Sequence, residues 1–290
     1  MHEAYSKNSH FTVVIPLYNK EETIYRAIQS VLSQLDDRDQ IIVVDDGSID
    51  GSADVVRGIN DPRLLLIWQH NQGVSVARNR GIDAASTEHV AFLDADDWWL
   101  PGAVSEFKRM MRGCPECVMY CVGHVRCAPG EKIGYCKGSP VGNSDTLEGP
   151  DFISLYSREQ LINSSASCVK RVLVQKIGGF PVKARSGEDI YLWLRMALLG
   201  RVEVSRRPRV VVERPAPGVG RPLRDVVPYY IRWFSDPNRF KHFNKRERSA
   251  ISRFLLYRGI KICAGKVAAR NRRSAIQIFR AISRVKPNIL

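Results

Sequence analysis

Short apolar runs alternate with helix-type periodicity along the first hundred residues. Runs rich in Val, Ile and Leu predict buried strands at residues 11–16, 41–44, 64–68 and 89–93. Between these runs, apolar residues recur at the three- and four-residue spacing of an amphipathic helix, which predicts helices near residues 24–32, 52–59 and 74–85. Repeated strand–helix units favour an α/β fold with a mostly parallel sheet and helices on both faces.

The later part of the chain continues the pattern and then becomes helical. A strand is predicted at 118–125, another at 209–213, and Pro101 is expected to open a helix as its first-turn proline. Helices are predicted near residues 225–234, 245–264 and 274–285. The Pro and Gly density around residues 215–222 predicts a boundary between a first domain, 1–215, and a helical C-terminal region, 216–290.

Two of the predicted strands end in clustered aspartates. The strand at 89–93 is followed by Asp94, Asp96 and Asp97, and the strand at 41–44 by Asp45 and Asp46. Like charges this close shift their pKa values or need a cation, and Mg²⁺ or Mn²⁺ binds one or two carboxylates together with phosphate oxygens. Strand ends in open α/β sheets are where ligands bind. The sequence therefore predicts a metal–diphosphate site, with a polar Asp-rich turn as the alternative.

Five motifs stand in order between residues 11 and 215. They are VVIPLYNKEETIYRAIQSVLSQ, VVDDGSIDGS, NQGVSVARNRGIDAA, FLDADDWWLPGA and an IGGF segment followed by Gly-Glu-Asp. Each motif is weak alone, but the ordered set is specific. With it the chain resembles an inverting family 2 glycosyltransferase of the GT-A fold. The resemblance implies transfer of a sugar from a nucleotide-diphosphate sugar, most commonly a UDP-sugar, to a hydroxyl of a saccharide or lipid-linked saccharide. The implied setting is cell-surface polysaccharide or glycolipid biosynthesis.

The resemblance also implies roles for residues that bind the donor nucleotide. The segment after the first strand, here Pro16, Tyr18 and Asn19, would contact the nucleotide. Asp46, the second aspartate of the DDGS motif, would hydrogen-bond the pyrimidine base.

The DxD motif implies a divalent cation, Mn²⁺ or Mg²⁺, as cofactor. Asp96 is the first choice for its ligand, Asp97 lies directly beside it, and Asp94 would sit near the ribose or the sugar. The cation would stabilise the negative charge that develops on the leaving nucleoside diphosphate.

The Glu-Asp motif implies that Asp189 is the general base that takes the proton of the acceptor hydroxyl. Glu188 points about 100° away on a helix, so only one of the two faces the cleft. Without the resemblance, Asp189 reads as a carboxylate favoured by the helix dipole. Arg78 has two equal interpretations: it reaches the diphosphate or the sugar, or it is a surface arginine paired with a DxD carboxylate.

One stretch departs from the family pattern. Where many relatives have an Arg-x-His motif after the later strand, this chain has Arg214-Pro-Ala216. Either the metal has one protein ligand fewer, or basic residues such as Arg214 or Arg221 hold the diphosphate.

Composition bears on the size of the core, the cellular location and the state of the cysteines. A chain of 290 residues with 44% hydrophobic content can bury a full core. No apolar leader occurs in 1–10 and no stretch of about 18 apolar residues follows, so we expect a cytoplasmic protein whose seven cysteines are reduced thiols. Cys114 and Cys117 have zinc-like spacing, but no second close pair accompanies them, which favours buried thiols over a metal site.

The positive charge is concentrated in the C-terminal third. Residues 201–290 hold 23 Lys or Arg and 5 Asp or Glu, a net charge of +18, whereas the rest of the chain carries −4. Aromatic residues interleave with these bases, which favours docking on the anionic inner face of a membrane. An ordinary solvated appendage or a homo-oligomer contact through the C-terminal helices is the alternative.

Two other classes of protein fit less well. A sugar-1-phosphate nucleotidyltransferase needs a Gly-rich loop with Arg after the first strand, where this chain has PLYNKEE. A nucleic-acid-binding protein is suggested by the basic tail alone, and no recognised nucleic-acid motif accompanies it, so we expect no nucleic-acid partner.

Overall fold

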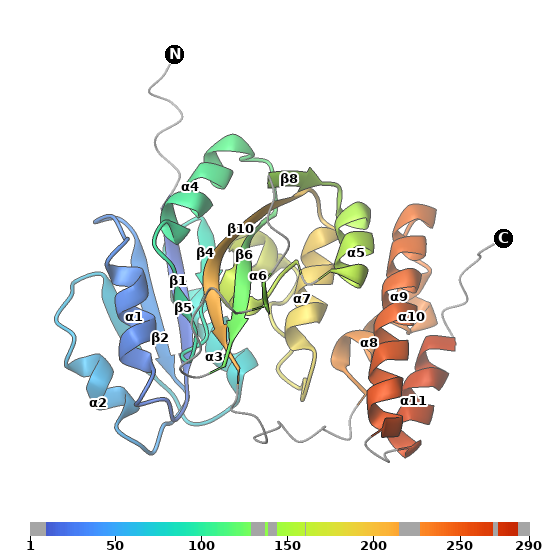
Figure 1. Ribbon diagram of the computed structural model, residues 1–290, viewed down its shortest axis with the longest axis horizontal. Coiled ribbons are helices and arrows are strands. Elements are labelled where there is room, and N and C mark those ends of the chain that lie inside the picture. The colour runs from blue at the N-terminus through green and yellow to red at the C-terminus, as the bar shows by residue number, and fades with distance from the viewer. Residues whose placement is uncertain are drawn as a thin grey trace.

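The computed structural model describes residues 10–128, 137–138, 144–159, 161–214, 227–268 and 272–283. In this part of the chain, one central sheet has helices on both faces, and the C-terminal helices lie beside it at one end (Figure 1). The strand order is β3 (Leu64–Trp68), β2 (Gln40–Asp45), β1 (Phe11–Leu17), β4 (His89–Phe92), β9 (Ser167–Lys170), β6 (Met119–Cys127), β10 (Val202–Glu213) and β5 (Trp98–Trp99). Two short strands pair at the side: β7 (Lys137–Gly138) with β6, and β8 (Ser144–Leu147) with β10.

The first half of the sheet is parallel. Strand β1 runs parallel to both of its neighbours, β2 and β4, and β2 runs parallel to β3. This arrangement and the flanking helices confirm the predicted fold class. The second half mixes directions, because β9 is antiparallel to β4 and to β6, while β10 is parallel to β6. The two-residue strand β5, antiparallel to β10, is too short for a periodicity to reveal.

Two apolar cores cover the two faces of the sheet. Along β1, Val13 and Ile15 belong to one core and Val14 to the other, as the alternation of side chains along a strand requires. The first core includes side chains of α1 (Ile24–Leu32), α2 (Ser52–Arg57) and α4 (Ala103–Gly113). The second core includes side chains of α3 (Val74–Ala84), α5 (Gly149–Arg158), α6 (Arg171–Lys176) and α7 (Glu188–Ala197). Burial on both faces explains why these strands read as continuous apolar runs.

A glycine sets how closely α3 approaches the sheet. A Cβ atom at Gly81 would lie 2.3 Å from Cγ1 of Val14 in β1, which is far inside van der Waals contact. The missing side chain therefore lets the helix backbone lie directly on the strand. Arg78 lies one helical turn before Gly81, so this close packing also fixes the position of its long side chain.

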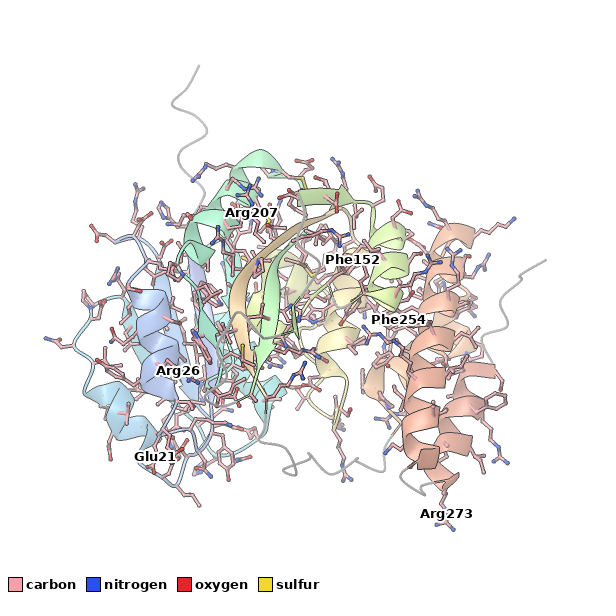
Figure 2. All side chains as sticks on the ribbon, in the orientation of Figure 1. Glu21, Arg26, Phe152, Arg207, Phe254 and Arg273 are labelled. Atoms are coloured by element: carbon pink, nitrogen blue, oxygen red, sulfur yellow. A yellow bond between two sulfur atoms is a disulfide. The ribbon has the colours of Figure 1, made fainter. Side chains whose placement is uncertain are left out.

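The C-terminal helices share the second core. They are α8 (Tyr229–Phe234), α9 (Pro237–Phe240), α10 (Lys245–Ala268) and α11 (Arg272–Ser283), near the predicted helical ranges. The ring of Phe254 in α10 lies 5.3 Å from that of Tyr156 in α5 and 6.0 Å from that of Tyr230 in α8. Phe152 stacks on Tyr156 at 5.7 Å, so aromatic rings fill the space where α5 faces α10 (Figure 2). The predicted domain boundary between residues 215 and 216 lies outside the described residues.

Two local expectations were wrong. Pro101 does not open a helix: it lies in a turn, and Gly102, with a φ of 85°, separates it from α4, which begins at Ala103. The left-handed glycine reverses the chain there, which proline cannot do. The cysteines are not all reduced thiols, because Cys114 and Cys117 form a disulfide.

Other cysteines follow the prediction of small buried residues. Cys121 and Cys168 are free and buried, and burial raises the pKa of each thiol. Cys136 lies outside the described residues. Among the helices that the structure describes, none combines the length and the apolar character needed to span a bilayer.

Candidate functional site

The acidic strand ends lie along one edge of the sheet, as predicted. Strand β1 separates β2 from β4, so the loop that follows β1 lies between the two aspartate clusters. Pro16 in β1 is opposite Val44 in β2, and Leu17 is opposite Asp45. This edge is the carboxyl end of the parallel strands, where a ligand meets loops instead of helices.

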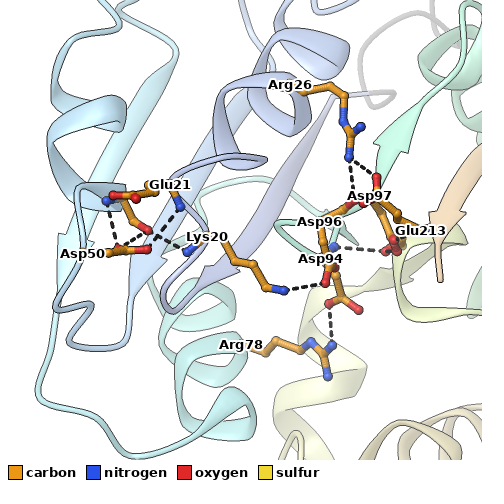
Figure 3. A network of polar contacts seen from close by, with 11 residues as sticks. Lys20, Glu21, Arg26, Asp50, Arg78, Asp94, Asp96, Asp97 and Glu213 are labelled. Atoms are coloured by element: carbon orange, nitrogen blue, oxygen red, sulfur yellow. Dashed lines mark hydrogen bonds and ion pairs between the residues drawn. The ribbon is translucent and has the colours of Figure 1, made fainter. Parts of the chain in front are cut away.

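Asp94 and Asp96 each pair with a cation from a different element. Oδ1 of Asp94 accepts a hydrogen bond of 2.6 Å from Nη2 of Arg78, and Oδ2 of Asp96 lies 2.8 Å from Nζ of Lys20 (Figure 3). Within the described ranges, no hydrogen bond reaches the other oxygen of either carboxylate. Mg²⁺ or Mn²⁺ is bound by one or two protein carboxylates together with phosphate oxygens of the substrate. The two aspartates, each with one carboxylate oxygen that accepts no hydrogen bond in the described structure, therefore fit such a cation.

Asp97 is turned away from them and is buried. Its Oδ2 lies 2.5 Å from Oγ of Ser165, and its Oδ1 accepts a 3.0 Å hydrogen bond from the backbone N–H of Glu213. Burial and then the charges of Asp94 and Asp96 raise the pKa of Asp97. Because both oxygens already have protein partners, these contacts suit a residue that positions the DxD segment. Its role as a direct metal ligand stays a prediction.

Arg78 is a buried cation among three carboxylates. Its side chain is only 4% exposed, and its Nη1 lies 3.7 Å from Oε1 of Glu188 in addition to the bond with Asp94. Burial alone would lower the pKa of Arg78, but Asp94, Glu188 and Asp189 together raise it. The arginine is thus paired with a DxD carboxylate, as one interpretation expected, yet it is not at the surface.

Asp189 lies in the first turn of α7, beside this cluster. The helix begins at Glu188, directly after Gly187, whose φ of 75° lets the chain turn into the helix. Burial raises the pKa of Asp189 despite the positive charge of Arg78, and burial followed by the charge of Asp189 raises the pKa of Glu188. Glu188 points toward Arg78, so Asp189 is the carboxylate of this pair without an ion-pair partner in the described structure. A raised pKa brings a carboxylate closer to the range that suits a general base.

Asp46 is buried under the segment that leads into α3. Its carboxylate accepts hydrogen bonds from the side chain of Gln69 at 2.7 Å and from the backbone N–H groups of Gln72 and Gly73, both at 2.8 Å. These three bonds fix the course of residues 69–73 at the nucleotide side of the edge. The predicted bond from Asp46 to a pyrimidine base stays a prediction.

Hydrogen bonds join the loop after β1 to the loop after β2. Asn19 has a left-handed backbone, with φ of 50°; its N–H donates to Oγ of Ser48 at 3.1 Å, and its Oδ1 accepts from Ile49 N–H at 2.9 Å. Tyr18 precedes it and is 45% exposed. The arrangement leaves an aromatic face at the edge, on which a planar base could stack.

A first missed residue is Asn79, which explains the IGGF segment. Its side-chain amide donates to the carbonyl of Phe180 and accepts from the N–H of Phe180, each at 2.8 Å. The ring of Phe180 then lies 5.1 Å from the guanidinium of Arg78. The two partners are about a hundred residues apart in the sequence, so no spacing rule points to the contact; the only signal is that Asn79 adjoins Arg78 in its motif.

The polar contacts of Arg26 were also not predicted from the sequence. Its Nη2 lies 2.5 Å from Oε2 of Glu213 and 3.1 Å from the carbonyl of Asp96, and its guanidinium covers the ring of Trp98 at 4.0 Å (Figure 3). Lys20, which pairs with Asp96, was missed as well. Both cations belong to the first motif of the chain, but their reach to the DxD segment depends on the strand order.

Residues 12–137 match the model of glycosyl transferase family 2. This range contains the loop after β1, Asp46, Arg78 and all three aspartates of the DxD segment. The match spans 126 of the chain's 290 residues, and this part of the chain is similar to the family. Asp189 lies outside the matched residues.

Three curated relatives each match over about 90 residues. The chain is 36% identical over 95 residues to the E. coli protein named UDP-Glc:alpha-D-GlcNAc-diphosphoundecaprenol beta-1,3-glucosyltransferase WfaP, covering 32% of this chain and 38% of that protein. It is 45% identical over 87 residues to the succinoglycan biosynthesis protein ExoO of Rhizobium meliloti, covering 30% and 25%. It is 39% identical over 89 residues to glycosyltransferase GlyA of Streptococcus pneumoniae, covering 30% and 13%. The chain thus spans well under half the length of each of these relatives.

Solved structures of S. aureus TarS are similar over nearly the whole chain. The crystal structure of TarS 1-349 with UDP-GlcNAc has a TM-score of 0.63 at 14% identity, covering 94% of this chain and 91% of that one. The TarS structure with UDP has a TM-score of 0.56 at 15% identity, covering 96% and 92%. The similarity supports the GT-A fold and extends it over the C-terminal helices, which the family match does not reach.

Proposed function

We propose that the protein is a metal-dependent inverting glycosyltransferase. It moves a sugar from a nucleotide-diphosphate sugar, in the first place a UDP-sugar, to a hydroxyl of a saccharide or lipid-linked saccharide. The observation that carries the proposal is the cluster of Asp94, Glu188 and Asp189 around the buried Arg78, next to the half-free carboxylate of Asp96. Carboxylates from two distant parts of the chain meet there at the ligand-binding edge of the sheet.

The chemistry assigns different tasks to the acids. Asp189 removes the proton of the acceptor hydroxyl as its oxygen attacks the anomeric carbon, on the face opposite to the leaving group. Arg78 holds Asp94 and Glu188 in place, and its charge keeps part of the carboxylate cluster ionised at neutral pH. Attack from the opposite face inverts the anomeric centre.

Asp96 and Asp94 would hold the divalent cation, Mn²⁺ or Mg²⁺. When bound, such a cation supplies Lewis-acid stabilisation of the negative charge on the departing diphosphate. Lys20 is already paired with Asp96 at 2.8 Å and adds a second positive charge on that side. Asp97 and Ser165 keep the DxD segment in place from behind.

The family and the named relatives support the substrate class. The WfaP name specifies a UDP-sugar donor and a lipid diphosphate acceptor, and TarS was crystallised with UDP and with UDP-GlcNAc. ExoO is named for succinoglycan biosynthesis. We therefore place this protein in cell-surface polysaccharide or glycolipid biosynthesis.

Replacement of the base tests the proposal. Asp189→Asn keeps the shape of the side chain but removes its proton affinity. The rate of sugar transfer, followed as release of UDP from the donor, should therefore fall by roughly two to four orders of magnitude, while binding of UDP persists. Release of UDP with a panel of UDP-sugars is the measurement, and Asp54→Asn, at an exposed acid of α2, is the matched control. Turnover of Asp189→Asn within a factor of a few of the parent would move the base elsewhere.

We also propose that the C-terminal helices dock on an anionic membrane from the cytoplasmic side. The exposed surfaces of α10 and α11 combine apolar side chains, among them Ile260 and the 66% exposed Phe279, with basic residues such as Lys261 and Arg273 (Figure 2). Exposed apolar side chains and cations on these two helices suit the interface of a bilayer with anionic headgroups. The competing occupant, a second copy of the chain, is an outcome of the test described below.

A further inference from the structure

Lys20, Arg26 and Arg78 each contact the DxD segment, and Lys20 is held there by the fewest contacts (Figure 3). The guanidinium of Arg78 is buried between two carboxylates, and that of Arg26 lies 4.0 Å from the ring of Trp98. In the part of the chain that the structure describes, Nζ of Lys20 contacts only the carboxylate of Asp96, at 2.8 Å. This side chain is therefore able to leave the segment without breaking any other contact.

The backbone of Lys20 is fixed, whereas its side chain is free to move. Its N–H donates a 2.7 Å hydrogen bond to Oγ of the buried Ser52, and its carbonyl accepts hydrogen bonds from the N–H groups of Thr23 and Ile24 at the start of α1. The side chain of Lys20 is 41% exposed and that of Asp96 is 26% exposed, so water reaches both ends of the ion pair. Such an exposed pair contributes little to the stability of the fold. The flexible four-carbon side chain thus carries its charge from a fixed point of the loop after β1.

The carboxylate that pairs with Lys20 is also the one proposed to hold the divalent cation. Nζ of Lys20 lies 2.8 Å from Oδ2 of Asp96, and a cation on either oxygen of this carboxylate would lie close to the ammonium group. Like charges at short range repel, and more strongly where the protein excludes part of the water. Lys20 and the divalent cation therefore compete for Asp96, and each weakens the binding of the other.

A nucleoside diphosphate would resolve this competition. Mg²⁺ or Mn²⁺ bound through one or two carboxylates shares phosphate oxygens, so the diphosphate would reach Asp96 together with the cation. A lysine ammonium binds phosphate as a point charge. Lys20 lies on the loop between the two aspartate clusters, at the edge of the sheet where the nucleotide is expected. Its ammonium group would exchange a carboxylate for a phosphate and keep a negatively charged partner throughout.

We propose that Lys20 is an exchangeable counter-ion that couples binding of the divalent cation to binding of the donor's diphosphate. Without a nucleotide, its ammonium group neutralises Asp96 and opposes the cation. With a nucleotide, it pairs with a phosphate oxygen and leaves Asp96 to the cation. Because coupling between two ligands is reciprocal, each ligand raises the affinity for the other. This inference rests on the proposed transferase function and adds a phosphate-binding residue to its donor site.

Two titrations on the full chain measure the coupling. In the first, Mn²⁺ is titrated without nucleotide and free Mn²⁺ is followed by electron paramagnetic resonance. In the second, UDP is titrated calorimetrically at a saturating concentration of Mn²⁺. The test variant is Lys20→Met, which keeps the length of the side chain and removes its charge. The matched control is Lys176→Met, which removes an exposed positive charge from α6.

The two affinities of Lys20→Met should change in opposite directions. Mn²⁺ alone should bind about threefold to fivefold more tightly, because the competing ammonium group is gone. UDP with Mn²⁺ should bind about tenfold more weakly, as expected for the loss of a charged hydrogen bond. A purely structural role of Lys20 would weaken both, because a displaced loop after β1 would disturb the whole edge. Lys176→Met should leave both affinities as in the parent protein.

Other outcomes contradict the inference in distinct ways. An unchanged or weaker Mn²⁺ affinity in Lys20→Met would show that Lys20 does not compete for Asp96. An unchanged UDP affinity would show that its ammonium group does not bind the diphosphate. Equal changes in Lys176→Met would assign the effects to net charge. Failure of the parent protein to bind UDP with Mn²⁺ would instead refute the proposed function, and that result does not depend on any variant.

Discussion

The region before residue 201, which contains most of the sheet, and the region from residue 201 onward, which contains the C-terminal helices, have opposite net charges. The residues before 201 carry a net charge of −4 and gather aspartates at one edge of the sheet, where Arg78 pairs with Asp94 and Lys20 pairs with Asp96. The residues from 201 onward carry +18, and within the described ranges some of their cations, such as Arg258, form no ion pair. The acidic half binds its cations within the protein, whereas the basic half has charge left for ligands outside it.

Under the proposed function, the two regions would divide the substrates between them. Acidic strand ends suit a metal and the diphosphate of the donor, while the basic helices suit an anionic acceptor or membrane. They are nevertheless joined, because Phe254 of α10 packs in the same core as α5 and α7. Each prediction below acts on one region and asks whether the other responds.

The largest effect should follow from the acidic edge. Asp96→Ala removes the carboxylate proposed to anchor the cation, so transfer should be abolished and UDP affinity should fall, with EDTA producing the same loss. Product release and UDP calorimetry measure both, and Asp54→Ala, which removes an exposed carboxylate of α2, is the control. Full transfer in EDTA and in Asp96→Ala would show that the site works without a metal.

The next effect concerns the junction of the two regions. Phe254→Ala should lower the free energy of unfolding of the whole chain by about 3–5 kcal/mol, because the buried ring leaves a cavity between α5 and α10. Urea denaturation followed by circular dichroism gives the value, and Phe279→Ala, an exposed aromatic on α11, should change it by less than about 0.5 kcal/mol. Two separate transitions in the parent protein would mean that the C-terminal helices form a domain of their own.

A smaller, salt-dependent effect should come from the basic helices alone. The full chain should co-sediment with vesicles that contain anionic lipid at low salt, since each surface Lys or Arg adds about 1 kcal/mol. Binding should fade toward 1 M salt, where the Debye length is about 3 Å. Ile260→Ser with Phe279→Ser should weaken it and leave donor hydrolysis intact. The contrary outcome is co-sedimentation that is independent of the anionic lipid content, together with a dimer in light scattering that these substitutions disrupt. That outcome would make the surface a homo-oligomer contact.

The smallest effect is a change with pH. Because the pKa of Asp189 is raised above its ordinary value of 3.8, its ionised form is present above that raised pKa and is lost as the pH falls through it. The rate of transfer should then drop about tenfold per pH unit on the acid side, and Asp189→Asn should lack this limb. A kcat profile that stays flat down to about pH 4, with folding verified at each pH, would contradict the assignment.

The sequence alone determined the fold class and most of the acids. Strands with apolar residues on both faces are typical of a layered α/β sheet, and the runs at 11–16, 41–44, 64–68 and 89–93 predicted β1 to β4 within a residue or two, although Leu65 and Trp68 of β3 are exposed. The motifs around Asp46 and Asp94 predicted that both acidic clusters lie at one edge of the sheet, because carboxylates that follow parallel strands meet there, and the structure has them at that edge.

Only the tertiary structure decided how these acids are used. The three aspartates of one short segment turn to Arg78, Lys20 and Ser165, which come from three other elements, so their roles depend on strand order and helix packing. Periodicity records which face of an element is buried, but contacts across elements depend on the position of every backbone, and these positions are set by packing.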